Sequence, residues 1–101
     1  MSRTISSALR GSVVEEDVEL STLELCRACR ASEELVEVWV HEGVLRPLGE
    51  SPEAWRFGGD SLARTRLATR LMHDLDINSA GVALALDLLD HITELESRLR
   101  R

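Results

Sequence analysis

Two helix-start signals lie close together in the first half of the chain, and they constrain the fold more than any other feature. The stretch STLE, residues 21–24, has the form of a capping box, with Ser21 as the N-cap and Glu24 at the third helical position. A second N-cap, Ser32, follows after only a few residues, and Gly43 ends the helix that it begins. Two short helices joined in this way predict a helix-turn-helix arrangement.

Apolar residues indicate which face of each helix is buried. The first helix is expected to bury Leu23, Cys26 and Ala28 and to end near Ala31. In the second helix an apolar stripe at helical spacing consists of Leu35, Val36, Trp39 and Val40. Because both helices have one apolar face, we expect them to share one core.

The segments before and after this helix pair have β-strand character. Residues 45–48 and 54–57 are β-prone and flank the turn sequence GESPE, which predicts a small hairpin, or wing, with Trp55 and Phe57 on one face. Residues 13–20 allow a short strand with Val18 and Leu20 on one face. We expect residues 1–12 to be a flexible leader and residues 13–101 to form a single domain.

Two longer helices are predicted after the wing. Asp60 is expected to cap a helix from Ser61 to about Leu75, and its stripe comprises Arg64, Leu67, Ala68, Leu71, Met72 and Leu75. Asn78 or Ser79 then caps a last helix over about 79–100, whose segment 82–89 is apolar except for Asp87 and is expected to be buried on several sides. Its second half has a heptad-like seam that would pair two copies of the chain: Leu88, Ile92, Leu95 and Leu99.

The charge of the chain argues against several classes of partner. The net charge is -6, from 12 Arg and no Lys against 18 Asp and Glu, which opposes binding to nucleic acid or to an anionic membrane. The second helix would enter the major groove in a DNA-binding helix-turn-helix. That helix carries only acidic charge: Glu33, Glu34, Glu37 and Glu42.

Acidic residues also gather towards the end of the chain. Asp87, Asp90 and Glu94 recur at spacings of three and four, near His91, and Asp74 and Asp76 lie in the preceding turn. We expect these six residues to bind a basic protein partner through complementary charge. A solvated helix face is the alternative interpretation.

No arrangement of residues indicates catalysis, a cofactor or a metal site. Cys26 and Cys29 form a lone C-x-x-C without the further ligands that a zinc site needs, so we interpret Cys26 as a small core residue and Cys29 as incidental. The three histidines stand apart, and there is no nucleophile elbow or P-loop. We find no secretory signal and no run long enough to span a membrane, and we expect a cytoplasmic, non-enzymatic protein.

Three stretches resemble the amino-terminal part of MerR-type regulators. Residues 41–47 (HEGVLRP) are similar to the stretch after that family's second helix, and residues 55–57 (WRF) followed by Asp60 resemble its wing exit. Residues 72–82 (MHDLDINSAGV) resemble the junction to its last helix, with Asp76 in place of a glycine. The resemblance covers residues 18–99 and implies a mostly α, winged helix-turn-helix fold with a small hairpin wing and a long Leu-rich C-terminal helix. Residues 36–39 (VEVW) depart from the phosphate-contacting residues of that family.

Within this superfamily the chain resembles the MerR-like chaperone-modulator family, CbpM. The similarity lies in its size and acidity and in the stretches LC at 25–26, SEEL at 32–35, WRF at 55–57 and GVALAL at 81–86. It implies that the chain binds the J-domain of a DnaJ-like, CbpA-type co-chaperone and inhibits both its co-chaperone and its DNA-binding activities. A J-domain engages its chaperone through a basic helix, which an acidic competitor would complement.

Two other functions remain open. The first is a MerR-type transcription regulator close to the heat-shock repressors, against which the glutamates of the second helix and the net charge argue. The second is a homodimerisation module that pairs through the terminal helix, which is compatible with either regulatory role.

Overall fold

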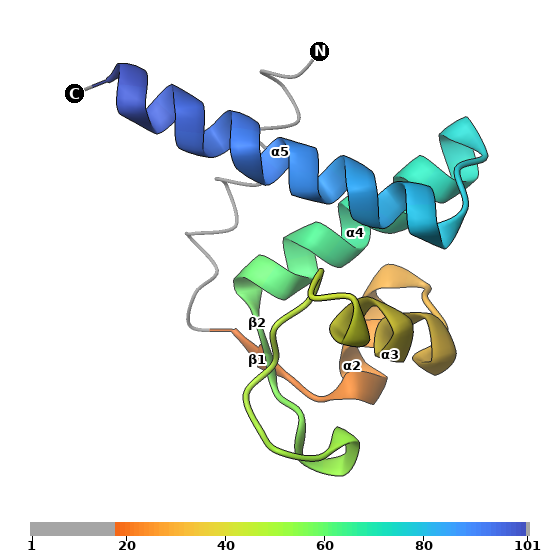
Figure 1. Ribbon diagram of the computed structural model, residues 1–101. Coiled ribbons are helices and arrows are strands. Elements are labelled where there is room, and N and C mark those ends of the chain that lie inside the picture. The colour runs from red at the N-terminus through yellow and green to blue at the C-terminus, as the bar shows by residue number, and fades with distance from the viewer. Residues whose placement is uncertain (1–17, 101) are drawn as a thin grey trace.

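The computed structural model describes residues 18–100 and is mostly helical, as the sequence predicts (Figure 1). Its elements in chain order are β1 (Glu19–Leu20), α2 (Thr22–Cys29), α3 (Glu33–His41), the 3-10 turn η2 (Pro52–Ala54), β2 (Phe57–Gly58), α4 (Gly59–Leu75) and α5 (Ser79–Leu99). The predicted leader, residues 1–12, lies outside the described residues.

Both predicted N-caps of the helix pair are confirmed. The backbone N–H of Ser21 donates to Glu24 Oε1 at 2.9 Å, and the backbone N–H of Glu24 donates to Ser21 Oγ at 3.2 Å, which completes the capping box of α2. Ser32 Oγ accepts from the backbone N–H of Leu35 at 3.1 Å at the start of α3. Helix α2 ends at Cys29, slightly before the expected end, because Arg30 takes a left-handed conformation with φ 57°.

The buried face of α2 differs from the one expected. Leu23 and Ala28 are exposed, whereas Leu25 and Cys29 are buried together with the predicted Cys26. Helices α3 and α4 and strand β1 all pack on α2, and Leu25, Cys26 and Cys29 belong to the core cluster that forms there. The expected stripe of α3 is confirmed, since Val36 and Trp39 are buried and Leu35 and Val40 are half-buried.

The wing forms differently from the predicted hairpin. Residues 45–48 and 54–57 meet at a single antiparallel bridge between Leu48 and Arg56, and η2 lies between them. Strand β2 instead pairs antiparallel with β1, with Leu20 opposite Phe57. Trp55 and Phe57 are buried, and their rings meet edge to face with centroids 6.1 Å apart.

The two long helices form near their expected bounds, with two corrections. Gly58 is the N-cap of α4, so Asp60 lies inside the first turn and does not cap the helix. Leu75, placed on the buried stripe, is 63% exposed. Asp76 takes φ 53° and so fits the left-handed position that a glycine would favour, and the predicted cap Asn78 accepts from the backbone N–H of Gly81 at 2.8 Å.

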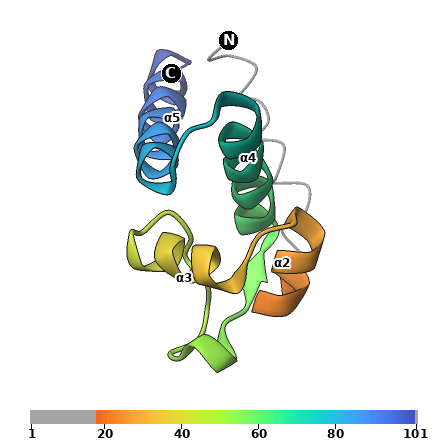
Figure 2. The same ribbon diagram turned by 90° about the vertical axis from the view of Figure 1, so that its right-hand side faces the viewer.

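Helix α4 lies at the centre of the molecule, with α2 on one side and α5 on the other (Figure 2). The core forms where these helices, α3 and the segment around β2 meet, and its fully buried large side chains are Trp39, Phe57, Leu25, Leu45, Leu86, Val36 and Val82. The expected burial of α5 on several sides is wrong. Only one face packs, and Leu84 and Leu88 are 60% and 52% exposed.

Candidate protein-interaction surface

Helix α5 divides into three faces of different chemistry. Its core face holds Val82, Leu86 and Leu89, which pack against the rest of the domain. The other two faces follow from the helical repeat, because residues three and four apart lie on one side. One of them carries exposed leucines and the other carries carboxylates, so a single helix supplies both surfaces that a protein partner would meet.

The apolar face contains the residues predicted as a dimer seam. Leu88, Leu95 and Leu99 are 52%, 56% and 87% exposed, and Ile92 is half-buried. Leu84 extends the face towards the start of the helix. A row of leucines that the rest of the described chain leaves in solvent is typical of a surface that pairs with another protein.

The acidic face contains three of the predicted partner-binding residues. Asp87, Asp90 and Glu94 are all exposed on one side of α5, and His91 is exposed next to them. Asp74 and Asp76 are exposed at the junction between α4 and α5. All six predicted residues therefore lie on the solvent side of the last two helices.

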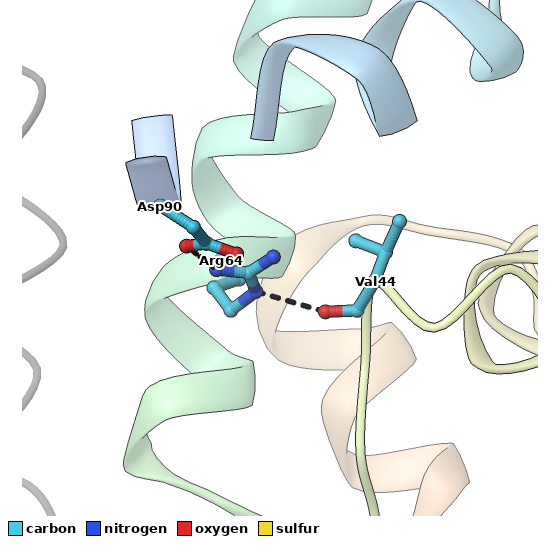
Figure 3. A network of polar contacts seen from close by, with 3 residues as sticks. All are labelled: Val44, Arg64 and Asp90. Carbon is cyan, nitrogen blue, oxygen red and sulfur yellow. Dashed lines mark hydrogen bonds and ion pairs between the residues drawn. The ribbon is translucent and has the colours of Figure 1, made fainter. Parts of the chain in front are cut away.

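The carboxylates of this face are not equivalent, because Asp90 serves the interior of the molecule. Arg64 Nη1 donates to Asp90 Oδ1 at 2.7 Å, and Arg64 Nε donates to the backbone carbonyl of Val44 at 2.8 Å (Figure 3). The Arg64 side chain is only 10% exposed, whereas that of Asp90 is 47% exposed. A buried guanidinium needs such partners, so Asp90 neutralises a charge of the core.

Glu94 is paired in a different way. It accepts from Arg98 Nη2 at 2.8 Å along the same helix, with both side chains more than half exposed. Exposed pairs of this kind contribute about 0.3–0.5 kcal/mol and exchange readily with other charges. The pair therefore leaves Glu94 accessible to a cationic partner.

The solvent side of α3 is also acidic, as the sequence predicts. Glu33, Glu34, Glu37 and Glu42 are all exposed. A cavity of about 200 Å³ separates α3 from the 3-10 turn and is lined by Glu33, Glu37 and Glu53 together with Thr22, Pro52 and Trp55. These carboxylates would repel a phosphate backbone at the place where a DNA-binding helix-turn-helix receives it.

The cysteines are part of the core. Cys26 and Cys29 are 7% and 6% exposed, and the thiol of Cys29 lies 3.8 Å from the carbonyl oxygen of Leu62. Burial raises the pKa of both thiols, and the Glu33 carboxylate raises that of Cys26 further. Both are thus unreactive thiols, and Cys29 is a packing residue, in contrast to the incidental role expected for it. Within residues 18–100 no three side chains of His, Cys, Asp or Glu are grouped to hold a metal ion.

Sequence reasoning placed Arg64 on a stripe of α4 but missed its role. The signal was available, because an arginine among leucines and alanines on a buried face requires a carboxylate or carbonyl partner. The partners themselves could not be read from the sequence, since Val44 and Asp90 are 20 and 26 residues away.

Comparisons with known proteins show which proteins this chain is similar to. A family described as MerR HTH family regulatory protein matches residues 20–101. A protein of Coxiella burnetii (strain Dugway 5J108-111) named Chaperone modulatory protein CbpM is 38% identical over 92 residues, which are 91% of this chain and 87% of the relative. A protein of the same name from Pseudomonas putida (strain GB-1) is 35% identical over 80 residues, which are 79% of each chain. No helix within residues 18–100 has the length and apolar character required to cross a membrane.

Proposed function

We propose a chaperone-modulating role for this chain, because it belongs to the MerR HTH regulatory family and, within it, to the chaperone modulatory proteins CbpM. Its partner in this proposal is the J-domain of a DnaJ-like, CbpA-type co-chaperone. Binding occludes the basic surface through which a J-domain engages its chaperone, and it inhibits the co-chaperone and DNA-binding activities of that protein.

The observation that carries this proposal is the combination of an acidic helix-turn-helix with an acidic α5. The exposed charge of α3 is carboxylate, which removes the phosphate contacts of a DNA-binding domain. Helix α5 presents Asp87 and Glu94 in solvent, where complementary potentials would steer a basic partner. Asp74, Asp76 and His91 extend the same proposed surface.

A homodimer is the second element of the proposal. Leu88, Ile92, Leu95 and Leu99 form its seam, with the exposed leucines of one copy packed against those of another. In the proposed winged helix-turn-helix, the segment around η2, residues 46–56, occupies the position of the wing.

Calorimetry with a purified J-domain tests the proposal directly. We expect saturable binding that weakens as salt is raised, and loss of the J-domain's stimulation of a DnaK-type ATPase in proportion to occupancy. A J-domain whose basic helix has been charge-reversed is the control and should not bind. Absence of J-domain binding, together with specific enrichment of DNA fragments by the chain, would instead support a MerR-type transcription regulator.

A further inference from the structure

Arg64 joins three parts of the molecule that are distant in sequence. It extends from α4 to the turn after α3 through the Val44 carbonyl, and to α5 through Asp90 (Figure 3). Beside these contacts is a cavity of about 350 Å³, lined by Val44, Arg46, Asp60, Arg64 and Asp90. These polar contacts add to the apolar contacts of Val82, Leu86 and Leu89 that pack α5 on the core.

Two exposed carboxylates of α5, Asp87 and Asp90, have different surroundings. Asp90 contacts a guanidinium that is 10% exposed, so withdrawing Asp90 would remove a counter-ion from a buried charge. Asp87 lies one turn earlier on the same exposed side of α5. A partner that meets Asp87 would leave the contact between Arg64 and Asp90 in place, whereas one that takes Asp90 Oδ1 would compete with Arg64 for it.

We propose that Arg64 clamps Asp90 to position α5 against the turn after α3, so that Asp90 is a positioning residue while Asp87 and Glu94 supply the charge that a basic partner meets. The proposal rests on the proposed function in one respect, since the partner it refers to is the J-domain. It divides the acidic face into a structural carboxylate and two recognition carboxylates.

Two alanine variants on the same helix form a matched pair. Asp87→Ala and Asp90→Ala each remove one exposed carboxylate and gain the same helix propensity, so they differ only in the clamp. Arg64→Met breaks the clamp from the other side and leaves the Asp90 charge in place. Arg64→Lys serves as the milder variant if Arg64→Met does not fold.

The measurement is the association and dissociation rate of a purified J-domain at low and high salt, at a temperature where every variant is folded. Asp87→Ala should lower the association rate about three-fold at low salt and weaken its salt dependence. Asp90→Ala and Arg64→Met should leave the salt dependence unchanged and raise the dissociation rate about five-fold.

Other results would overturn the proposal. An equal loss of salt dependence in Asp87→Ala and Asp90→Ala would make Asp90 a direct contact, as would faster association of Arg64→Met, in which Asp90 is released. If the dissociation rate were unchanged in both Asp90→Ala and Arg64→Met, the contact between Arg64 and Asp90 would stabilise the fold without positioning α5 for the partner.

Hydrogen exchange separates this proposal from the proposed function. The backbone amides of Val44 and Leu45 donate to the Trp39 carbonyl at 2.8 and 3.2 Å, and they report on the turn that Arg64 holds. They should exchange faster in Asp90→Ala and Arg64→Met than in Asp87→Ala. If the unmodified chain failed to bind a J-domain, the proposed function would fall while faster exchange would still support the clamp. Equal exchange in all variants would refute the clamp itself.

Discussion

The α2–α3 pair and helix α5 use their amino acids in opposite ways. Both short helices are capped and bury only part of their apolar residues in the core, and the exposed side of α3 is dominated by carboxylates. In α5 the buried residues, Val82, Leu86 and Leu89, all lie in the first half, and none of residues 91–99 is fully buried. The α2–α3 pair thus serves as a scaffold for the core, whereas α5 carries exposed apolar surface that no other described residue covers.

Length explains the difference. Helix α5 has 21 residues, and its carboxyl-terminal half extends past the other described elements (Figure 1). Leucines on the overhanging part of the helix are left in solvent by residues 18–100, and such exposed apolar surface is typical of an interaction site. The exposed leucines of α5 are thus available for the proposed seam, whereas the buried ring of Trp39 in α3 contributes to the core.

The largest effect should come from breaking the scaffold at Trp39. Its side chain is fully buried, so Trp39→Ala should cost about 3–5 kcal/mol of unfolding free energy through lost burial and a cavity. Denaturant titration measures this loss. Leu99→Ala, at a position that is 87% exposed, is the comparison on α5 and should change the monomer's stability little.

Trp39→Phe sharpens the same test. The indole N–H has no hydrogen-bond partner within the described part of the chain, so removing it sacrifices no polar contact there. Phe should therefore cost much less than Ala. A similar loss for both variants would contradict the view that Trp39 acts through apolar burial alone.

The next effect concerns self-association through α5. The double variant Leu95→Gln and Leu99→Gln should raise the dimer dissociation constant at least about 100-fold, because four leucines per dimer lose apolar burial. Sedimentation equilibrium measures the constant. Leu48→Gln is the control, since this residue is 73% exposed but lies in the turn before η2. Unchanged association of the double variant would exclude this half of α5 as the seam.

A smaller effect should distinguish the two acidic surfaces. Two double variants change the net charge equally: Asp87→Arg with Glu94→Arg on α5, and Glu34→Arg with Glu37→Arg on α3. The α5 pair should weaken J-domain binding about ten-fold at low salt, since the contact charges are reversed, and calorimetry would measure it. The α3 pair should leave affinity within about two-fold. An equal loss in both would mean that net charge, and not the α5 surface, attracts the partner.

Local features of the fold could be predicted from the sequence, and distant pairings could not. The caps at Ser21, Ser32 and Asn78 depend on atoms within three residues, so the sequence contains all the information needed. The antiparallel partner of Leu20 is Phe57, which depends on how the helices between them pack. The predicted hairpin therefore forms only at the bridge between Leu48 and Arg56, because strand propensity alone does not select a partner.

The candidate surface shows the same limit. Helical spacing grouped the carboxylates of α5 on one face and its exposed leucines on another, since both groupings depend only on the repeat of a single helix. It could not separate Asp87 from Asp90, because that distinction arises where Arg64 reaches across from α4. Burial on several sides was expected of residues 82–89 because composition indicates apolar character but not the number of neighbours that cover it.

The smallest effect should appear at acidic pH, where the N-cap contact of α2 should weaken and that of α5 should not. The Glu24 carboxylate accepts from the backbone N–H of Ser21 and from its hydroxyl, and these bonds lower the pKa of Glu24 in the folded chain. A lowered pKa stabilises the folded state above the unfolded value of about 4.3, and this contribution is lost as the pH falls through the folded value. The Asn78 amide, which caps α5, does not titrate in this range.

Amide exchange, expressed as protection relative to the unfolded chain, measures this difference near neutral pH and in mild acid. Protection of the Ser21 and Glu24 amides should fall in acid, while that of the Gly81 amide at the start of α5 should persist. Glu24→Gln is the control, because its uncharged side chain removes the pH dependence at α2. Equal loss of protection at Gly81 would show that acid loosens the whole domain, and the two ends would then not respond separately. Selective loss at α2 would show that the acid-sensitive contact lies in the α2–α3 pair and that the N-cap of α5 stays intact.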